Sequence, residues 1–237
     1  KLYNFFGFYY DVYAPYYAGG SLKSANLIGA NLHGVTLVDT NLAWANLTDA
    51  NLSESNLTGT NFHYALLTNA DFTGANLERS MFYQSESDNV NFRNADLSYA
   101  NLCDFYDNIG SDFTGANFFH THLSKAQLEG YTFDSVYIES TDFRKAYLIN
   151  TDFSKSNLIS ADFAQADLTG ANLSNLDLSN SNFENANLSN SNLKNSSLRN
   201  SNLSGANLSG VDLSSHDLTN TVLTGANLSN SNLTGID

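Results

Sequence analysis

The chain has 237 residues and a formal net charge of −14, from 24 Asp and Glu against 10 Lys and Arg. The sequence shows no basic patch, which excludes a protein that binds nucleic acid directly by neutralising its phosphates. The single cysteine, Cys103, excludes an internal disulfide, and no stretch is long and apolar enough to predict insertion into a membrane.

Residues 1–19 form an aromatic-rich segment that we treat as a unit of its own. Tyr and Phe favour contacts with other surfaces, so the segment is either a cap over the part that follows or an arm that docks on another molecule. Its candidate interface residues are Tyr3, Phe5, Phe6, Phe8, Tyr9, Tyr10, Tyr13, Tyr16 and Tyr17.

From Leu22 onwards, a large apolar residue recurs at every fifth position. On an α-helix this spacing places successive side chains about 140° apart, and on one long strand it alternates their faces, so neither element buries them. A small residue lies two positions before each large one, as Ala186 does before Leu188. Each unit is therefore expected to be a very short strand with two inward side chains, followed by a turn. Such a period predicts a stack of coils around a filled apolar core.

The phenylalanines fall mainly on alternate units, as at Phe62, Phe72 and Phe82. This ten-residue period predicts an even number of sides, with Phe columns on opposite faces and Leu columns between them. Side chains twenty residues apart are expected to lie one coil apart. We therefore expect Trp44 to stack on Tyr64. His216 occupies a small-residue position and is expected to disturb its coil.

Several runs resemble the motif A(D/N)LXX of the pentapeptide-repeat family: ANLIGANLHG, ADFTGANLER and ADLTGANLSN. The resemblance covers residues 20–237. It implies an all-β fold, a right-handed quadrilateral β-helix of about eleven coils. Eleven of the acidic residues stand at the D/N position of the motif, so much of the negative charge belongs to the repeat itself.

The period is disturbed in two places, near residues 83–91, where Ser87 replaces a large apolar residue, and near residues 103–112, where one residue is inserted. We expect irregular side loops there, and such loops are where a solenoid often binds its partners, although ordinary decay of the repeat is the alternative. The candidate contact residues are Tyr83, Glu86, Asp88, Phe105, Tyr106, Asp107 and Ile109. Further exposed or awkwardly placed aromatic residues nearby are Tyr99, Tyr131, Tyr137 and Tyr147.

The sequence contains no phosphate loop, nucleophile elbow or zinc signature. His120 and His122 are close enough in sequence to share a metal, but two solvated surface residues are the favoured interpretation. Asp142 and Asp162 are expected to stack one coil apart as a tolerated ladder rather than as an acid–base pair. We therefore expect a non-enzyme with no catalytic residue, no cofactor and no metal.

Three functional hypotheses follow. The first is a structural, self-assembling rod whose partners are copies of itself, joined through the aromatic segment and the far end, with a filament as one form of the assembly. Its candidate contacts at the far end are Leu228, Leu233 and Ile236. The second, implied by the family resemblance, is an acidic DNA-mimicking regulator of a type II topoisomerase; such relatives usually dimerise through a C-terminal helix, which this sequence lacks. The third is a protein-binding scaffold that acts through its side loops. Because the chain begins at Lys1, we favour export or the cell surface over the cytoplasm, whereas the regulator hypothesis implies a cytoplasmic protein.

Overall fold

The computed structural model describes residues 19–103, 105 and 110–236. The aromatic segment up to residue 18, with all its candidate interface residues, lies outside this range, and so do Tyr106, Asp107 and Ile109. Over the described range there is no helix and no strand longer than a bridge. The secondary structure is a set of isolated parallel bridges, from Ser21↔Asn41 to Asp212↔Asn232. No helix in the described ranges has the length and apolar character needed to cross a membrane.

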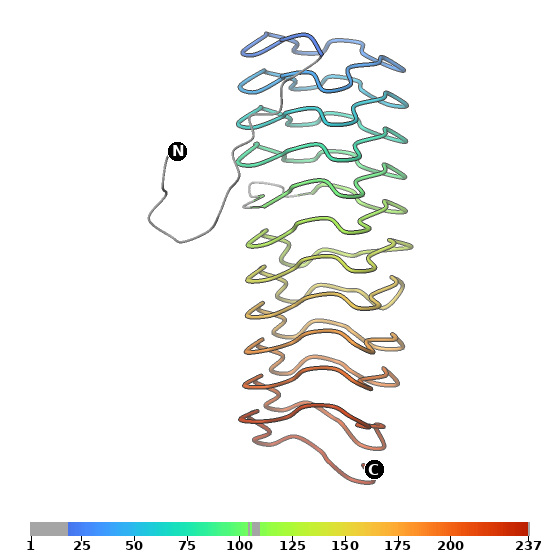
Figure 1. Cartoon of the computed structure of the whole chain (residues 1–237), viewed down its shortest axis with the longest axis vertical. Coiled ribbons are helices and arrows are strands. Elements are labelled where there is room, and N and C mark those ends of the chain that lie inside the picture. Colours follow the sequence, from blue (N-terminus) through green and yellow to red (C-terminus); the bar gives the residue numbers. More distant parts are fainter. Residues whose placement is uncertain (1–18, 104, 106–109, 237) are drawn as a thin grey trace.

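Each bridge joins a residue to the one twenty positions later, and the spacing becomes 21 where the inserted residue intervenes, as at Asn91↔Asp112. Four five-residue units therefore complete one coil. The chain winds as a right-handed quadrilateral β-helix of about eleven coils, drawn as a column of stacked loops in Figure 1. This architecture confirms the fold expected from the five-residue period.

The turn in each unit explains the composition of the chain. The N–H of Ala25 donates to the carbonyl of Leu22 at 3.0 Å, and Ser24, between them, has a φ of 58°. A negative φ followed by a positive φ is the pattern of a type II turn. Gly and Asn tolerate the left-handed region best, which is why they recur at this position, as in Gly29 (φ 62°) and Asn185 (φ 56°).

The Asn or Asp that precedes each large residue holds the following turn. The Oδ1 atom of Asn41 accepts the N–H of Ala43 at 3.0 Å, and Asp71 accepts that of Thr73 at the same distance. The amide of Asn182 also donates to Asp162 of the preceding coil at 2.9 Å. Because a carboxylate and an amide oxygen accept this hydrogen bond equally well, the motif tolerates either residue.

Phenylalanine rings fill two opposite faces of the core, as the ten-residue period predicts. Along one face, Phe143 and Phe163 stack with ring centroids 5.0 Å apart, and along the other, Phe133 and Phe153 stack at 4.8 Å. Rings from the two faces meet edge to face across the centre, because ten residues are half a coil; the Phe143–Phe153 rings, for example, are tilted by 76°. The interior is therefore filled by side chains and is not a channel.

The second inward position of each unit, two residues before the large one, normally holds Ala, Ser or Thr. We call it the small-residue slot. Where the slot holds Tyr131, Leu176 or His216, the bridge to the preceding coil is missing. The pairs without a bridge in the described chain are Asp112–Thr132, Asn157–Asp177 and Ser197–Asp217, together with Asn192–Asp212 beside Val211. Side chains as large as Tyr131, Leu176 and His216 thus separate two coils locally, whereas Val90 and Val136 occupy slots whose bridges are intact. The expected disturbance at His216 is one instance.

Candidate functional site

The expected irregular loop at residues 83–91 is not present. This segment forms two regular units, and Glu86 pairs with Leu66 of the preceding coil. Ser87 is fully buried in the position of a large apolar residue, where its hydroxyl lies 3.2 Å from that of Ser85. The prediction was wrong because the buried serine hydroxyl finds a hydrogen-bonding partner there, so the coil stays regular.

Phe105 is also part of the core. We expected it on a side loop, but it occupies a small-residue slot, has no exposed surface, and lies 6.4 Å from the rings of Phe82, Phe92 and Phe113. An aromatic ring gains more by entering a void in an apolar core than by remaining in water. Phe105 is therefore a core residue and not a surface contact.

Tyr131 is the second aromatic residue that occupies a small-residue slot. Its half-buried ring lies 5.8 Å from the ring of Phe113, and its hydroxyl is hydrogen bonded to Ser111. Ser111 in turn donates to the carbonyl of Ser87 at 2.6 Å. Burial raises the pKa of Tyr131, and the nearby charge of Asp88 adds to this effect. The phenol thus remains neutral and anchored at neutral pH.

The presence of Tyr131 opens the wall of the solenoid. The Phe113 and Phe133 rings are 6.2 Å apart, compared with 5.1 Å for Phe92–Phe113 and 4.8 Å for Phe133–Phe153. The N–H of Phe113, which in a regular coil would donate to the carbonyl of Thr132, makes no such bond. One rung of the backbone ladder is therefore open at this level.

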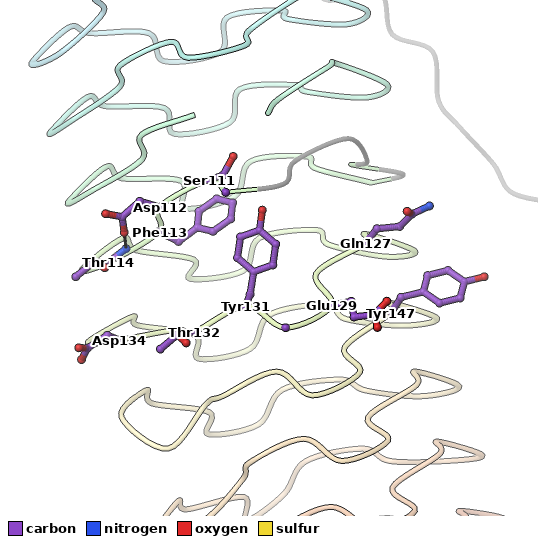
Figure 2. Close-up of a pocket in the computed structure, with 12 residues that line it drawn as sticks. Ser111, Asp112, Phe113, Thr114, Gln127, Glu129, Tyr131, Thr132, Asp134 and Tyr147 are labelled. Carbon is purple, nitrogen blue, oxygen red and sulfur yellow. Dashed lines mark hydrogen bonds between the residues drawn. The ribbon is translucent and has the colours of Figure 1, made fainter. Parts of the chain in front are cut away.

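A groove of about 840 Å³ lies over the opening. We call it the Tyr131 groove. In Figure 2 the Tyr131 ring stands in its middle, with Asp112, Thr114 and Asp134 on one side and Gln127, Glu129 and Tyr147 on the other. The described residues that line it are Gly110, Ser111, Asp112, Phe113, Thr114, Gln127, Glu129, Gly130, Tyr131, Thr132, Asp134 and Tyr147.

The groove is acidic. Although partial burial acts to raise the pKa of Asp112, hydrogen bonds from Thr114 and the charge of Arg93 outweigh it and lower the pKa. Arg93 lies 3.3 Å from Asp112, and Lys155 lies 3.3 Å from Asp134. Glu129 is exposed and makes no such ion pair in the described structure. The groove therefore presents carboxylates beside two tyrosine rings.

A second, smaller groove of about 550 Å³ is lined by Asp142, one of the two stacked aspartates that the sequence suggested, together with His122 and Arg144. Asp142 and Asp162 are paired across successive coils, as expected. Arg144 lies between them, donating to Asp142 at 2.8 and 2.9 Å and lying 3.8 Å from Asp162. Burial opposes ionisation of Asp142, but hydrogen bonds from His122 and Arg144 hold its pKa well below the ordinary value. The arrangement is an ion-paired ladder.

The two neighbouring histidines are not directed to one point. His122 lies 3.6 Å from Asp142, whereas the ring of His120 stacks on Tyr99 with centroids 5.3 Å apart. Nowhere in the described ranges do three or more His, Cys, Asp or Glu side chains form a group that could hold a metal.

The remaining predicted residues occupy three regions. Tyr83 lies at one corner, 6.1 Å from the ring of Tyr64, which stacks on Trp44 at 4.2 Å as expected. Glu86 is exposed, and Asp88 is half-buried near Tyr131. In the last described coil, Leu228 is half-buried and Leu233 and Ile236 are exposed.

In the sequence, Tyr131 and Tyr147 stand out only as awkwardly placed aromatic residues with no sign that they lie together, and Glu129 does not stand out at all. The available signal was the position of Tyr131 two residues before Phe133, in a slot that otherwise holds small residues. Whether a tyrosine in this slot breaks the backbone hydrogen bonds between two coils depends on the residues of the preceding coil, and no local sequence motif describes those contacts.

The comparison with protein families agrees with this architecture. The family "Pentapeptide repeats" matches eight stretches, some of which overlap: residues 19–43, 25–63, 37–74, 70–104, 109–133, 137–175, 177–214 and 201–237. Among curated proteins there is no match. One similar solved structure is HetL, a pentapeptide repeat protein involved in heterocyst differentiation regulation from the cyanobacterium Nostoc sp. strain PCC 7120, with 25% identity, 90% coverage of both chains and a TM-score of 0.33. A pentapeptide repeat protein from the Arabidopsis thaliana thylakoid lumen is 31% identical over 42% of this chain and 66% of its own, with a TM-score of 0.37. A trypsin-treated form of QnrB1, a plasmid-mediated fluoroquinolone resistance protein, is 22% identical over 90% of this chain and 88% of its own, with a TM-score of 0.38. With its repeats matched along nearly the whole sequence, the chain belongs to the pentapeptide-repeat family.

Proposed function

We propose that this protein is a non-enzymatic, protein-binding rod and that it engages its partner along the flank that carries the Tyr131 groove. The observation that carries the proposal is the opening of the wall at Tyr131, where the Asp112–Thr132 bridge is missing and a groove of about 840 Å³ lies over the gap. Binding on solenoids concentrates at such departures from the repeat.

The filled core supports a role in binding. Leu and Phe side chains occupy the interior with essentially no exposed surface, so the rod offers partners its flanks and ends. The groove volume is within the range of sites that enclose a drug-sized ligand or a few side chains of a partner. The groove also combines tyrosine rings with polar groups, a composition typical of protein interfaces.

Site-specific photo-cross-linking tests this function. A photoreactive amino acid at Gln127, on the rim of the groove, is compared with one at Asn220, an exposed turn position several coils away. We expect a discrete adduct from Gln127 alone, and we expect the cross-linked protein, once purified, to bind the unmodified rod directly. Equal labelling at both positions, or no direct binding by the purified protein, would contradict the proposal.

A second candidate function is end-to-end self-association, the assembly hypothesis of the sequence analysis. It is supported by the first described coil, in which Leu22, Leu27, Leu32 and Leu37 are only partly buried and, within residues 19–103, pair with the following coil alone. An exposed apolar coil of this kind is a template for pairing with another chain. Light scattering over a range of concentrations, with electron microscopy, tests it. A species that stays monomeric at high concentration argues against it.

The topoisomerase alternative is supported by the net charge of −14. Against it, much of this charge is committed to structure, since Asp71 holds its own turn and Asp142 is paired with Arg144. A gyrase supercoiling assay with and without a quinolone tests this role. No effect of the rod at micromolar concentration would exclude it.

A further inference from the structure

We propose that the Tyr131 groove recognises an extended segment of the partner protein that carries arginine or lysine side chains. This inference rests on the protein-binding function proposed above and specifies the chemistry of the partner. It is argued from the carboxylates, the open backbone rung and the aromatic rings of one groove.

The carboxylates lie on both sides of the Tyr131 ring. Asp112 and Asp134 are on one side and Glu129 is on the other, as Figure 2 shows. Two of these carboxylates are paired with exposed basic side chains. Arg93, the partner of Asp112, has 53% of its side-chain surface exposed, and Lys155, the partner of Asp134, has 68%. Exposed ion pairs of this kind contribute little to the stability of the fold, so their carboxylates can exchange one basic partner for another. A basic segment laid across the groove would therefore meet acceptors on both sides.

The open rung favours a peptide over a simple cation. The Phe113 residue is 1% exposed, and its N–H lacks the acceptor that the same N–H finds in regular coils, as Phe92 finds the carbonyl of Asp112 at 2.8 Å. A buried donor of this kind requires an acceptor. A peptide supplies both a backbone carbonyl for this donor and cationic side chains for the carboxylates, whereas a polyamine supplies only the charge.

The aromatic rings fit the same ligand. Tyr147, with 52% of its surface exposed, stands beside Glu129 at the rim of the groove. A guanidinium or ammonium group that bonds to a carboxylate and lies over an adjacent ring gains a cation–π contribution. The combination of Glu129 and Tyr147 therefore selects for a basic side chain over a neutral one.

Fluorescence anisotropy with a defined probe tests this inference. The probe is a labelled peptide of alternating glycine and arginine, roughly eight residues long so that it spans the groove when extended. The reference probe has citrulline in place of arginine, which keeps the shape and removes the charge. We expect the arginine peptide to bind and Glu129→Gln to weaken it about tenfold, the effect of losing one charge-assisted hydrogen bond. Glu184→Gln is the matched control, because Glu184 is exposed at the same turn position of a distant unit. It is expected to leave binding unchanged.

The possible outcomes separate this inference from the function on which it rests. Equal binding of the citrulline peptide, or equal effects of Glu129→Gln and Glu184→Gln, would overturn recognition of a basic segment. Displacement of the peptide by spermidine at the same charge concentration would overturn recognition of a peptide. In each of these cases the proposed function would still stand if the protein cross-linked at Gln127 binds the unmodified rod directly. If neither the cross-linking nor the arginine-peptide experiment gives its expected result, both proposals are contradicted.

Discussion

The rule that a large side chain in a small-residue slot separates two coils can be tested by creating such a site. Ala186 occupies a slot in a regular part of the solenoid and is 1% exposed. Its neighbours form two ladder hydrogen bonds, from the N–H of Leu168 to Asn187 at 2.7 Å and from the N–H of Asn187 to Ala166 at 2.9 Å. We expect Ala186→Leu to break both bonds, as Tyr131 does in its own slot.

The magnitude follows from the two losses. Each ladder bond contributes about 1 kcal/mol net, and overpacking a filled core costs about 1–3 kcal/mol. The variant should therefore lose about 3–5 kcal/mol of unfolding free energy in urea. Locally, amide hydrogen exchange at Leu168 and Asn187 should become at least about tenfold faster, because their amides no longer need global unfolding to exchange.

The reverse substitution is the control. Leu176→Ala should restore the missing bridge between Asn157 and Asp177 and slow exchange at the amide of Leu158, even though the lost packing lowers global stability. Unchanged protection of Leu168 and Asn187 in Ala186→Leu would refute the reasoning. The missing bridges would then need a cause other than slot size.

Three further predictions follow from the core, the turns and one half-buried histidine. Phe153→Ala should lower the unfolding free energy by about 3–5 kcal/mol in urea titrations, because the ring of Phe153 stacks on Phe133 at 4.8 Å; a loss below about 1 kcal/mol would contradict the stacked core. Asn185→Val should cost about 1–2 kcal/mol because φ is 56° there, whereas Asn185→Gly should be nearly neutral; equal effects on the urea midpoint would argue against a strained turn. Burial lowers the pKa of His63, so its contribution to stability is present above the unfolded-state pKa of about 6.5 and is lost as pH falls below it; thermal melts at pH 7 and pH 5 should differ less in His63→Asn, and an unchanged difference would contradict this.

The fold could be predicted because the repeat is local. The five-residue period of Leu22 and its successors determines which side chains point inward, and the alternate phenylalanines indicate an even number of sides. The stack of Trp44 on Tyr64 and the pairing of Asp142 with Asp162 follow from the twenty-residue coil, and the structure has both.

The site could not be predicted in the same way, because it depends on how coils fill one another. Ser87 looked like a break in the repeat, yet its coil is regular and Phe105 enters the core nearby. Tyr131 looked like one exposed tyrosine among several, yet its slot position opens the wall above it. Only the packing between units shows that the large side chain of Tyr131 coincides with a missing bridge and a groove over it.

Amide hydrogen exchange at Phe113, with and without the arginine peptide, tests the central claim most directly. In the free protein we expect the amide of Phe113 to exchange faster than those of Phe92 and Phe133, whose N–H groups donate at 2.8 Å to Asp112 and Asp152. On addition of the peptide we expect exchange at Phe113 to slow. Equal protection of all three amides in the free protein, or slowing confined to other coils, would contradict the account.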